Sequence, residues 1–307
     1  MRATDFDVIV AGDLNVDLIL RGDAAPAFGQ AEQLLADARL VLGGSAGIFA
    51  CGAARLGLRV AFIGKVGADD FGRVALRELR AQGVDTAGVI VDPSVRTGIT
   101  VLLSCRGDRA LLTYPGAIAA LRCAEIDQAL LARGRHLHLG SYFLLDALRP
   151  DVPALFDAAH ARGLTVSLDT NYDPAGRWDG GLAEALARTD IFLPNAAEAR
   201  AVSGRDDPAE ALAALGARVP AVAIKLGAQG AIAMRDGRTA RAAPPPVDPV
   251  DTTGAGDSFD AGFVCGCLLG WDLARTLQLA CTCGALSTRG VGGTAAQATL
   301  DEALARM

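Results

Sequence analysis

The stretch Asp251–Phe263, DTTGAGDSFDAGF, joins an irregular segment to an apolar helical pattern. Gly254 and Gly256 stand just before Asp257, and glycines at the start of a helix leave backbone N–H groups open to a ligand. These unpaired donors, and the partial positive charge of a helix N-terminus, favour an anion and above all phosphate. The stretch therefore predicts a phosphate site at the beginning of a helix.

The carboxylate of Asp257 has two interpretations at such a site. As an ordinary first-turn acid it would stabilise the helix by about 0.3–1 kcal/mol. Beside a bound phosphate, a carboxylate repels the anion unless it is there to take a proton from the attacking group. Asp257 is therefore a candidate general base, and the helix-start donors should keep its carboxyl ionised at neutral pH.

Short β-rich runs alternate with helical stretches along most of the chain. The runs are Asp7–Ala11, Val60–Val66, His136–Leu139, Thr165–Asp169, Ile191–Pro194 and Ala221–Leu226. Such alternation indicates βαβ units and a mainly parallel sheet with helices on both faces. The sequence thus predicts a doubly wound α/β fold.

A different pattern interrupts this alternation at Ile99–Tyr114, where two apolar runs flank the turn-forming Arg106-Gly107-Asp108-Arg109. That pattern predicts an antiparallel hairpin. Further strands are expected within Leu18–Leu20 and Gln33–Leu42. We therefore expect one domain over residues 1–307, with a small discontinuous β-sheet lid formed from about residues 14–42 and 97–115.

Composition excludes several classes of protein. The chain has 307 residues, 51% of them apolar, and a net charge of −6, so it can bury a large core but offers no basic field for nucleic acid. No run approaches the length of a membrane span, and the first residues do not have a signal-peptide layout. A cytoplasmic protein without a nucleic-acid or membrane partner is expected. The P-loop and the G-x-G-x-x-G motif are both absent.

The glycine-rich stretch resembles the C-terminal signature of the ribokinase-like (PfkB) family of carbohydrate kinases. GGSAGIFACGAARLG, Gly43–Gly57, resembles the N-terminal signature of that family and stands about two hundred residues earlier. Four intermediate segments also resemble the family: GDLNVD at Gly12–Asp17, DTNYDP at Asp169–Pro174, PNAAE at Pro194–Glu198 and KLGAQG at Lys225–Gly230. The resemblance extends over nearly the whole chain.

This resemblance implies ATP-dependent transfer of the γ-phosphoryl group to a hydroxyl of a small sugar or related polyol, with Mg²⁺. By position the resemblance assigns catalysis to Asp257, Gly254, Ala255 and Gly256, and acceptor binding to Asn15, Asp17, Gly43, Gly44 and Asn171. It assigns ATP binding to Asn195, Lys225, Gly227, Cys281, Gly284 and Ser287. Glu198 is expected to bind Mg²⁺ through water, and Asp251 and Thr253 to bind a monovalent cation such as K⁺. Phosphoryl transfer has a loose transition state, so positioning and charge neutralisation matter more than a strong base.

Two departures from the family pattern bear on the acceptor. Ile48 stands where many members carry an asparagine, and Gly140 followed by Ser141 stands where ribokinases place an acid. Two polar sugar contacts are missing, which favours a less hydroxylated or partly apolar acceptor over ribose.

The acceptor classes can be ranked by the groups that each would need. A sugar phosphate needs converging cations; the candidates are Arg96, Arg106 and Arg109, and the last two are expected in an exposed turn, away from any pocket. Asp173 also stands where related kinases often carry arginine. A nucleoside needs stacking rings, for which the sequence offers Phe28, Tyr114, Tyr142 and Phe143. A neutral sugar therefore ranks first, a nucleoside second and a sugar phosphate third.

Two further expectations complete the sequence-based account. From a different class of function, a catalytically silent sugar-binding protein stays open, although the intact Asp257 and glycine turn argue against it. The hairpin at Ile99–Tyr114 carries apolar alternation on a strand pair that is marginally stable alone. We therefore expect a homodimer formed lid against lid.

Overall fold

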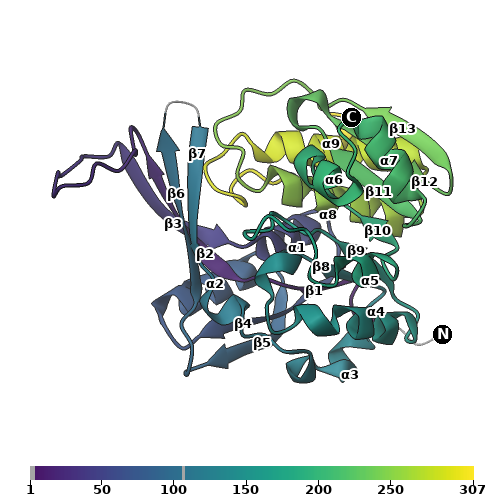
Figure 1. Ribbon diagram of the computed structural model, residues 1–307, viewed down its shortest axis with the longest axis horizontal. Helices are drawn as coiled ribbons and strands as arrows, with labels where there is room; N and C mark the ends of the chain where they lie inside the picture. Colours follow the sequence, from purple (N-terminus) through teal and green to yellow (C-terminus); the bar gives the residue numbers. More distant parts are fainter. Residues whose placement is uncertain (1–3, 106–107) are drawn as a thin grey trace.

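The computed structural model describes residues 4–105 and 108–307, which form two β-sheets of different size (Figure 1). The large sheet has nine strands in the order β13-β12-β11-β10-β9-β8-β1-β4-β5, and the small sheet has four in the order β3-β2-β6-β7. Each neighbouring pair from β11 through to β5 is parallel, whereas β12 pairs antiparallel with both β11 and β13. The doubly wound α/β fold is therefore confirmed.

The strands of the large sheet are β1 (Val8–Ala11), β4 (Val60–Gly67), β5 (Asp85–Asp92), β8 (His136–Leu139), β9 (Thr165–Leu168), β10 (Ile191–Phe192), β11 (Ala221–Lys225), β12 (Ala231–Arg235) and β13 (Arg238–Ala242). The helices are α1 (Ser45–Arg55), α2 (Asp70–Ala81), α3 (Gln128–Leu131), α4 (Val152–His160), α5 (Leu182–Leu186), α6 (Ala196–Ser203), α7 (Pro208–Gly216), α8 (Ala255–Leu268), α9 (Leu273–Ser287) and α10 (Leu300–Leu304).

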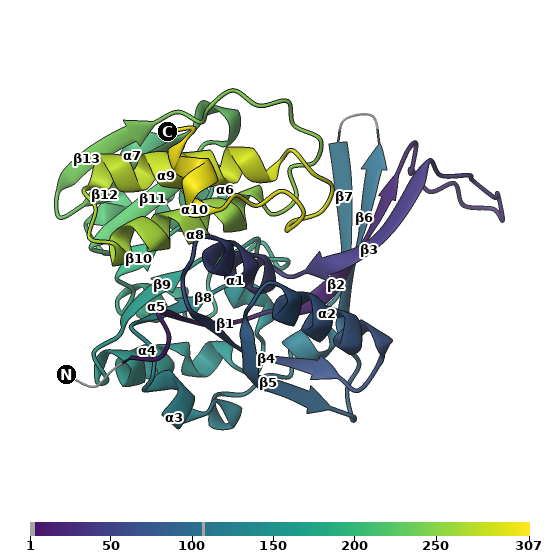
Figure 2. The same cartoon turned by 180° about the vertical axis from the view of Figure 1, so that it is seen from behind.

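Side-chain alternation along the buried strands builds one hydrophobic core on each face of the large sheet. In β1, Val8 and Val10 belong to the core shared with α1, α8 and α9. Ile9 and Ala11 belong to the other core, which includes α4, α5 and α7. Because a strand turns successive side chains to opposite faces, the continuous apolar run of β1 is what two helical layers require (Figure 2).

The small sheet stands beside the large one and consists of β2 (Asn15–Arg21), β3 (Asp37–Gly43), β6 (Gly98–Cys105) and β7 (Asp108–Tyr114) (Figure 1). Strands β6 and β7 pair antiparallel from Ile99 with Tyr114 to Cys105 with Asp108, which confirms the expected hairpin. Two residues of its predicted turn, Arg106 and Gly107, lie outside the described residues. The role of this sheet as a lid stays a prediction.

Strands β5, β12 and β13 were not expected from the sequence. The β12–β13 connection contains Asp236 and Gly237, which both have positive φ, at 51° and 76°. An Asp-Gly pair with that backbone is a strong hairpin signal, so this element was open to recognition. Strand β5 is half exposed at the edge of the sheet, and its apolar pattern is correspondingly weak.

In the part of the chain that the model describes, no helix is both long and apolar enough to span a membrane. The cytoplasmic location stays a prediction.

Candidate active site

Polar residues from both ends of the chain meet at the carboxyl edge of the large sheet. Asp13 and Asn15 follow β1, Asp169 follows β9, and Lys225 ends β11. In doubly wound folds ligands bind at this edge, because the loops that leave the parallel strands converge there. The small sheet and the start of α8 close the other sides.

A cavity of about 390 Å³ occupies this position. Its lining includes Asp13, Asn15, Asp17, Gly44, Ile48, Thr100, Arg109, Thr113, Asn171, Asn195, Glu198, Lys225, Gly227, Thr253, Gly254, Gly256 and Asp257. We call it the acceptor cavity, because polar side chains able to bind hydroxyl groups line it.

A second cavity, of about 520 Å³, lies next to the first and is lined mostly by apolar atoms. Its walls come from the connector Pro244–Val247 and from Phe259, Cys281, Gly284 and Ala285. The two cavities share Lys225, Gly227, Thr252 and Gly256 as lining residues. We call the second one the nucleotide cavity, because its apolar walls suit a purine ring and it meets the acceptor cavity at the start of α8.

The glycine turn has a backbone that only glycine adopts without strain. Gly254 caps the N-terminus of α8 with φ of 73°, and a Cβ at this residue would clash with Gly293 and Ile48. The Ala255 N–H makes only a long contact of 3.3 Å with the carbonyl of Thr252. Gly254 and Gly256 line the acceptor cavity, and Ala255 and Gly256 line the nucleotide cavity. The start of α8 thus lies where the two cavities meet, a position at which its first N–H groups would suit an anion.

Asp257 lies in the first turn of α8 with its side chain in the acceptor cavity. Burial first, and then the Asp169 carboxylate, raise the pKa of Asp257 to about 8, against the opposing effect of the Lys225 ammonium. This direction is opposite to the expectation that the helix-start donors keep the carboxyl ionised. Desolvation and neighbouring negative charge outweigh those donors.

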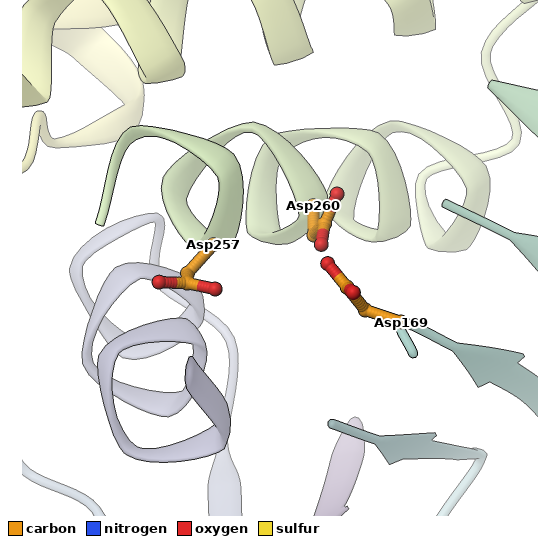
Figure 3. Close-up of side chains that lie close together, drawn as sticks. All are labelled: Asp169, Asp257 and Asp260. Atoms are coloured by element: carbon orange, nitrogen blue, oxygen red, sulfur yellow. The ribbon is translucent and has the colours of Figure 1, made fainter. Parts of the chain in front are cut away.

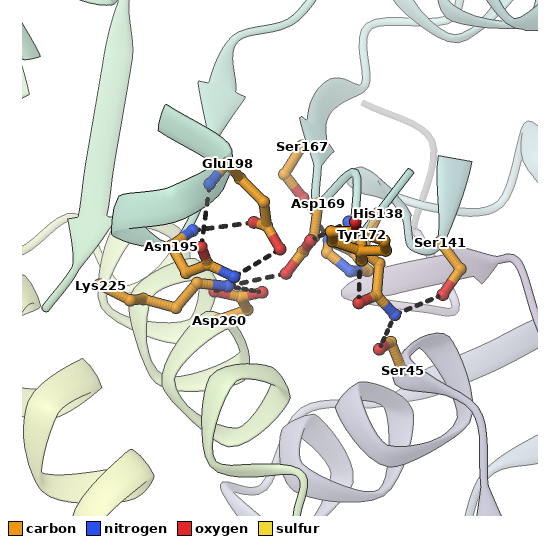
Figure 4. Close-up of polar contacts among 11 residues, drawn as sticks. Ser45, His138, Ser141, Ser167, Asp169, Tyr172, Asn195, Glu198, Lys225 and Asp260 are labelled. Atoms are coloured by element: carbon orange, nitrogen blue, oxygen red, sulfur yellow. Dashed lines mark hydrogen bonds and ion pairs between the residues drawn. The ribbon is translucent and has the colours of Figure 1, made fainter. Parts of the chain in front are cut away.

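The carboxyl groups of Asp169 and Asp260 lie beside Asp257 (Figure 3) and belong to a buried ion-pair cluster. Lys225 Nζ donates to Asp169 Oδ2 at 2.7 Å and to both carboxyl oxygens of Asp260 at 3.0 Å (Figure 4). Burial opposes its charged ammonium, but the Asp169 and Asp260 carboxyls raise the pKa of Lys225. Burial likewise opposes the ionised form of Asp169, yet Lys225 lowers the pKa of Asp169 to about 2.

Asp260 behaves differently from Asp169, since burial raises the pKa of Asp260 well above its usual value. Asp169 is thus the ionised partner of Lys225, and Asp260 favours its neutral form. The charge of Lys225 is consequently balanced inside the protein. Lys225 was assigned to ATP binding, but its ammonium contacts carboxyls.

Asn195 and Glu198 form a reciprocal cap at the start of α6. The Asn195 N–H donates to Glu198 Oε2 at 2.8 Å, and the Glu198 N–H donates to Asn195 Oδ1 at 3.0 Å. Such a capping box fixes both side chains. Burial, and then the Asp169 carboxylate, raise the pKa of Glu198 to about 7, so a cation nearby would favour its ionised form.

The acceptor-binding residues predicted from the sequence mostly gather in the acceptor cavity. Asn15 Nδ2 donates to Asp17 Oδ1 at 3.2 Å and to Thr100 Oγ1 at 3.3 Å. Burial, and then the Asp13 carboxylate, raise the pKa of Asp17 to about 7. Asn171 Nδ2 donates to Ser45 Oγ at 2.9 Å and to Ser141 Oγ at 3.2 Å.

Three assigned residues, Gly43, Asp251 and Ser287, do not line either cavity. Gly43 contributes space instead, because a Cβ there would overlap the Asp17 carboxylate. Ser287 is buried in α9, where its hydroxyl donates to the Gly284 carbonyl at 2.9 Å. Ser287 therefore belongs to the packing of α9, one turn from the nucleotide cavity.

Several residues that sequence reasoning missed also shape the site. The Asp13 carboxylate accepts from the N–H groups of Ser45 and Ala46 at 3.0 and 2.9 Å and so caps α1. Asp260 lies one turn after Asp257, and its spacing along α8 was a usable signal. The expectation that Arg109 points away from any pocket is wrong, since it lines the acceptor cavity and donates to Thr253 Oγ1 at 3.0 Å. Arg96, in contrast, is exposed and lines neither cavity.

A larger cavity, of about 920 Å³, opens at the opposite, amino edge of the large sheet. Its residues include His136, whose ring bonds to Thr165 and Ser167 at 2.7 Å, and burial lowers the pKa of His136 to about 4. This histidine is neutral and serves packing between strands. Among the described residues that line this cavity there is no helix start with an acid, so its size alone does not make it the reaction site.

Comparison with known proteins agrees with the geometry. The pfkB family carbohydrate kinase model matches residues 5–300. The ATP-dependent ribose-1-phosphate kinase of Halopiger xanaduensis is 35% identical over 298 residues, covering 96% of this chain and 95% of its own. A fructokinase of Klebsiella pneumoniae is 34% identical over 81% of this chain and 86% of its own.

A solved structure agrees as well. An E. coli protein described as a candidate ribokinase II, in complex with ATP and Mg²⁺, superposes with a TM-score of 0.86 at 28% identity over 98% of both chains. The fold and the paired cavities thus define a kinase of the ribokinase type. The chain belongs to the pfkB family of carbohydrate kinases, and it is an ATP-dependent sugar kinase.

The raised pKa of Asp257 predicts the pH dependence of the reaction. A base must be ionised, so in the free enzyme activity should rise as pH passes through about 8 rather than near the usual 3.8. The profile of kcat/KM, measured with both substrates below saturation, reports the free enzyme. Nucleotide affinity at each pH is the control. An acid limb centred near pH 4 would contradict the raised pKa of Asp257.

Proposed function

We propose that the chain transfers the γ-phosphoryl group of ATP to a hydroxyl of a small neutral sugar or polyol, with Asp257 as the general base. The observation that supports this most is the position of Asp257 in the acceptor cavity, one residue after Gly256, which lines both cavities. The adenine would lie between the Pro244–Val247 connector and the Cys281–Gly284 side of α9. The γ-phosphate would then reach the N–H groups of Gly254, Ala255 and Gly256.

The order of events follows from these positions. The acceptor hydroxyl lies against Asp257, attacks the γ-phosphorus and loses its proton to the carboxylate as the bond to the β-phosphate oxygen breaks. Helix-start N–H groups offset the charge on the transferring oxygens without reorganising. Because the hydroxyl becomes more acidic as it attacks, a carboxylate is a sufficient base.

Mg²⁺ would neutralise charge on the nucleotide phosphates. The carboxyl oxygens of Asp169, Asp257 and Asp260 lie within 4.8 Å of one another. The Lys225 ammonium is bound to two of these carboxyls, so a metal ion placed directly among them would meet a fixed positive charge. Glu198 and Asn195 fit better, because both line the acceptor cavity and carry side-chain oxygen atoms. They would hold Mg²⁺ through water, as that ion prefers.

The lining of the acceptor cavity favours a neutral acceptor. Asp13, Asp17, Asn15 and Asn171 offer acceptors and amide donors that suit hydroxyl groups, and the two carboxyls would repel a phosphate. Ile48 lines the cavity with an apolar side chain, at the position where many family members are expected to carry an asparagine. A sugar phosphate is the second candidate, because Arg109 does reach the cavity and one relative is named a ribose-1-phosphate kinase.

Substitution of Asp257 tests the function directly. With the best acceptor from a panel of neutral sugars and their phosphates, Asp257→Asn should reduce turnover by about 10²–10⁴-fold, because the base is lost and the shape is kept. Nucleotide affinity should stay within a few fold. Asp190→Asn, at the amino edge of the sheet, is the control for a carboxyl outside the site. Retention of more than a tenth of wild-type turnover would contradict the base assignment.

We propose that K⁺ activates the enzyme through Asp251 and Thr253, beside the glycine turn. The Asp251 carboxylate orders that turn by accepting from the N–H groups of Thr253 and Gly292, both at 2.9 Å. The Arg109 guanidinium lies 3.9 Å from Asp251, so the activation should be modest. Rates that are equal in K⁺ and in tetramethylammonium buffers would refute the proposal.

We propose a homodimer in which the small sheets of two copies pack together through their outer faces. Along its strands, the residues that alternate with the cavity-lining ones are apolar and at least partly exposed: Leu18, Leu20, Leu40, Val101, Leu103 and Leu112. A face of this kind, spread over four strands, is costly to leave in water. A second copy presents the same apolar face and would cover it.

Light scattering checks the dimer at micromolar concentration. Leu112 is 59% exposed, and Leu112→Asp should convert the dimer to a monomer by placing a charge in the interface. Val91→Asp, at a residue 51% exposed on β5 at the edge of the large sheet, should leave the dimer intact. A wild-type monomer would overturn the proposal.

A further inference from the structure

Arg109 lies on the face of the small sheet that is turned toward the cleft. In β7 it shares this face with Leu111 and Thr113, because side chains alternate along a strand, and all three line the acceptor cavity. Its backbone is paired with Ser104 of β6. The hairpin therefore carries a guanidinium across the cleft toward the start of α8.

The Arg109 side chain makes contact with the segment that precedes the glycine turn. Its Nη1 donates to Thr253 Oγ1 at 3.0 Å and lies 3.9 Å from Asp251 Oδ1. The two residues are 144 positions apart in the chain. The contact thus joins the small sheet to the large sheet's helical layer directly above the reaction site.

Thr253 transmits this contact to the glycine turn. Its hydroxyl accepts from Arg109 and donates to Asp251 Oδ1 at 2.7 Å, so the three groups form one chain of hydrogen bonds. Asp251 Oδ2 in turn accepts from the Gly292 N–H at 2.9 Å. Gly254, with its positive φ, follows Thr253 directly, and a shift of Thr253 would therefore move the N–H groups that receive the phosphoryl group.

The surroundings of Arg109 favour this role over binding of an anionic acceptor. The carboxyl groups of Asp251 and Asp17 are close enough to Arg109 that its positive charge favours the ionised form of each. A phosphate on the acceptor would be placed among these negative groups. The guanidinium instead has neighbours that it can hold in position, a hydroxyl and a carboxylate.

We infer that Arg109 is a positioning residue that couples closure of the small sheet over the acceptor to assembly of the anion-binding turn. When the small sheet lies over a bound sugar, Arg109 reaches Thr253 and orders the Thr253–Gly256 backbone. When the sheet is displaced, that turn loses its contact from above. Phosphoryl transfer to water is thereby disfavoured until an acceptor is present. This inference rests on the proposed function.

Arg109→Ala tests the coupling through the division of its effect between kcat and KM. Because a small misplacement of reacting groups costs about 10²-fold, kcat for the neutral acceptor should fall by about 10- to 100-fold, while KM for the acceptor changes less than threefold. Millimolar guanidinium, well below denaturing concentrations, should restore part of kcat. Arg39→Ala is the control, since Arg39 also lies in the small sheet but is ion-paired with Asp37.

A double-mutant cycle identifies the partner. Thr253→Val keeps the shape of the side chain but removes the hydroxyl, and the Arg109→Ala/Thr253→Val variant should lose no more activity than the more impaired single variant. Thr253→Ser should retain most of kcat. Melting temperatures of all variants confirm that they fold, so a loss of activity reports on the site.

Three outcomes would overturn the inference. They are an unchanged kcat in Arg109→Ala, additive losses in the cycle, and a loss that appears only as a raised KM for a phosphorylated acceptor; the last would make Arg109 the binding residue of an anionic substrate. Failure of the proposed function is distinguishable, because the wild-type enzyme would then transfer phosphate from ATP to no sugar of the panel.

Discussion

The contact of Lys225 with two buried carboxyl groups determines where the reaction site can form. Asp169 follows β9, Lys225 ends β11, and Asp260 belongs to α8, so one ammonium joins two strands of the sheet to the helix that carries Asp257. Loss of either partner from a buried ion pair leaves an uncompensated charge that costs about 3–5 kcal/mol. The hydrogen bonds from Lys225 to Asp260 therefore hold α8 against the carboxyl edge of the sheet, in addition to its apolar packing.

This arrangement determines which charged groups around the site are already paired with each other. The positive charge of Lys225 is balanced by Asp169 inside the protein, so our proposal assigns neutralisation of the nucleotide phosphates to the helix-start N–H groups and a metal ion. Burial first, and then the Asp169 carboxylate, raise the pKa of Asp257. Arrival of a cation with the nucleotide would favour the ionised base, which links the readiness of Asp257 to the presence of the second substrate.

Much of the fold and part of the site could be predicted from the sequence, for physical reasons. The buried parallel strands are continuous apolar runs between helical patterns, and the glycines before Asp257 mark a helix start that lines both cavities. The positions of Asp13 and Arg109 in the site were not predicted, because their roles depend on contacts between distant segments. Asp13 caps α1 from a loop after β1, and Arg109 meets Thr253 only when the small sheet stands beside α8. The charge of Asp257 was misjudged for the same reason, since Asp169 lies beside it only in the folded chain.

The most direct measurement is a crystal structure with a non-hydrolysable ATP analogue, Mg²⁺ and the preferred sugar. Our account predicts adenine in the nucleotide cavity against Cys281 and Gly284, the γ-phosphate on the N–H groups of Gly254–Gly256, and an acceptor hydroxyl hydrogen-bonded to Asp257. A nucleotide bound at the amino edge of the sheet, or a sugar whose hydroxyl groups lie away from Asp257, would contradict it.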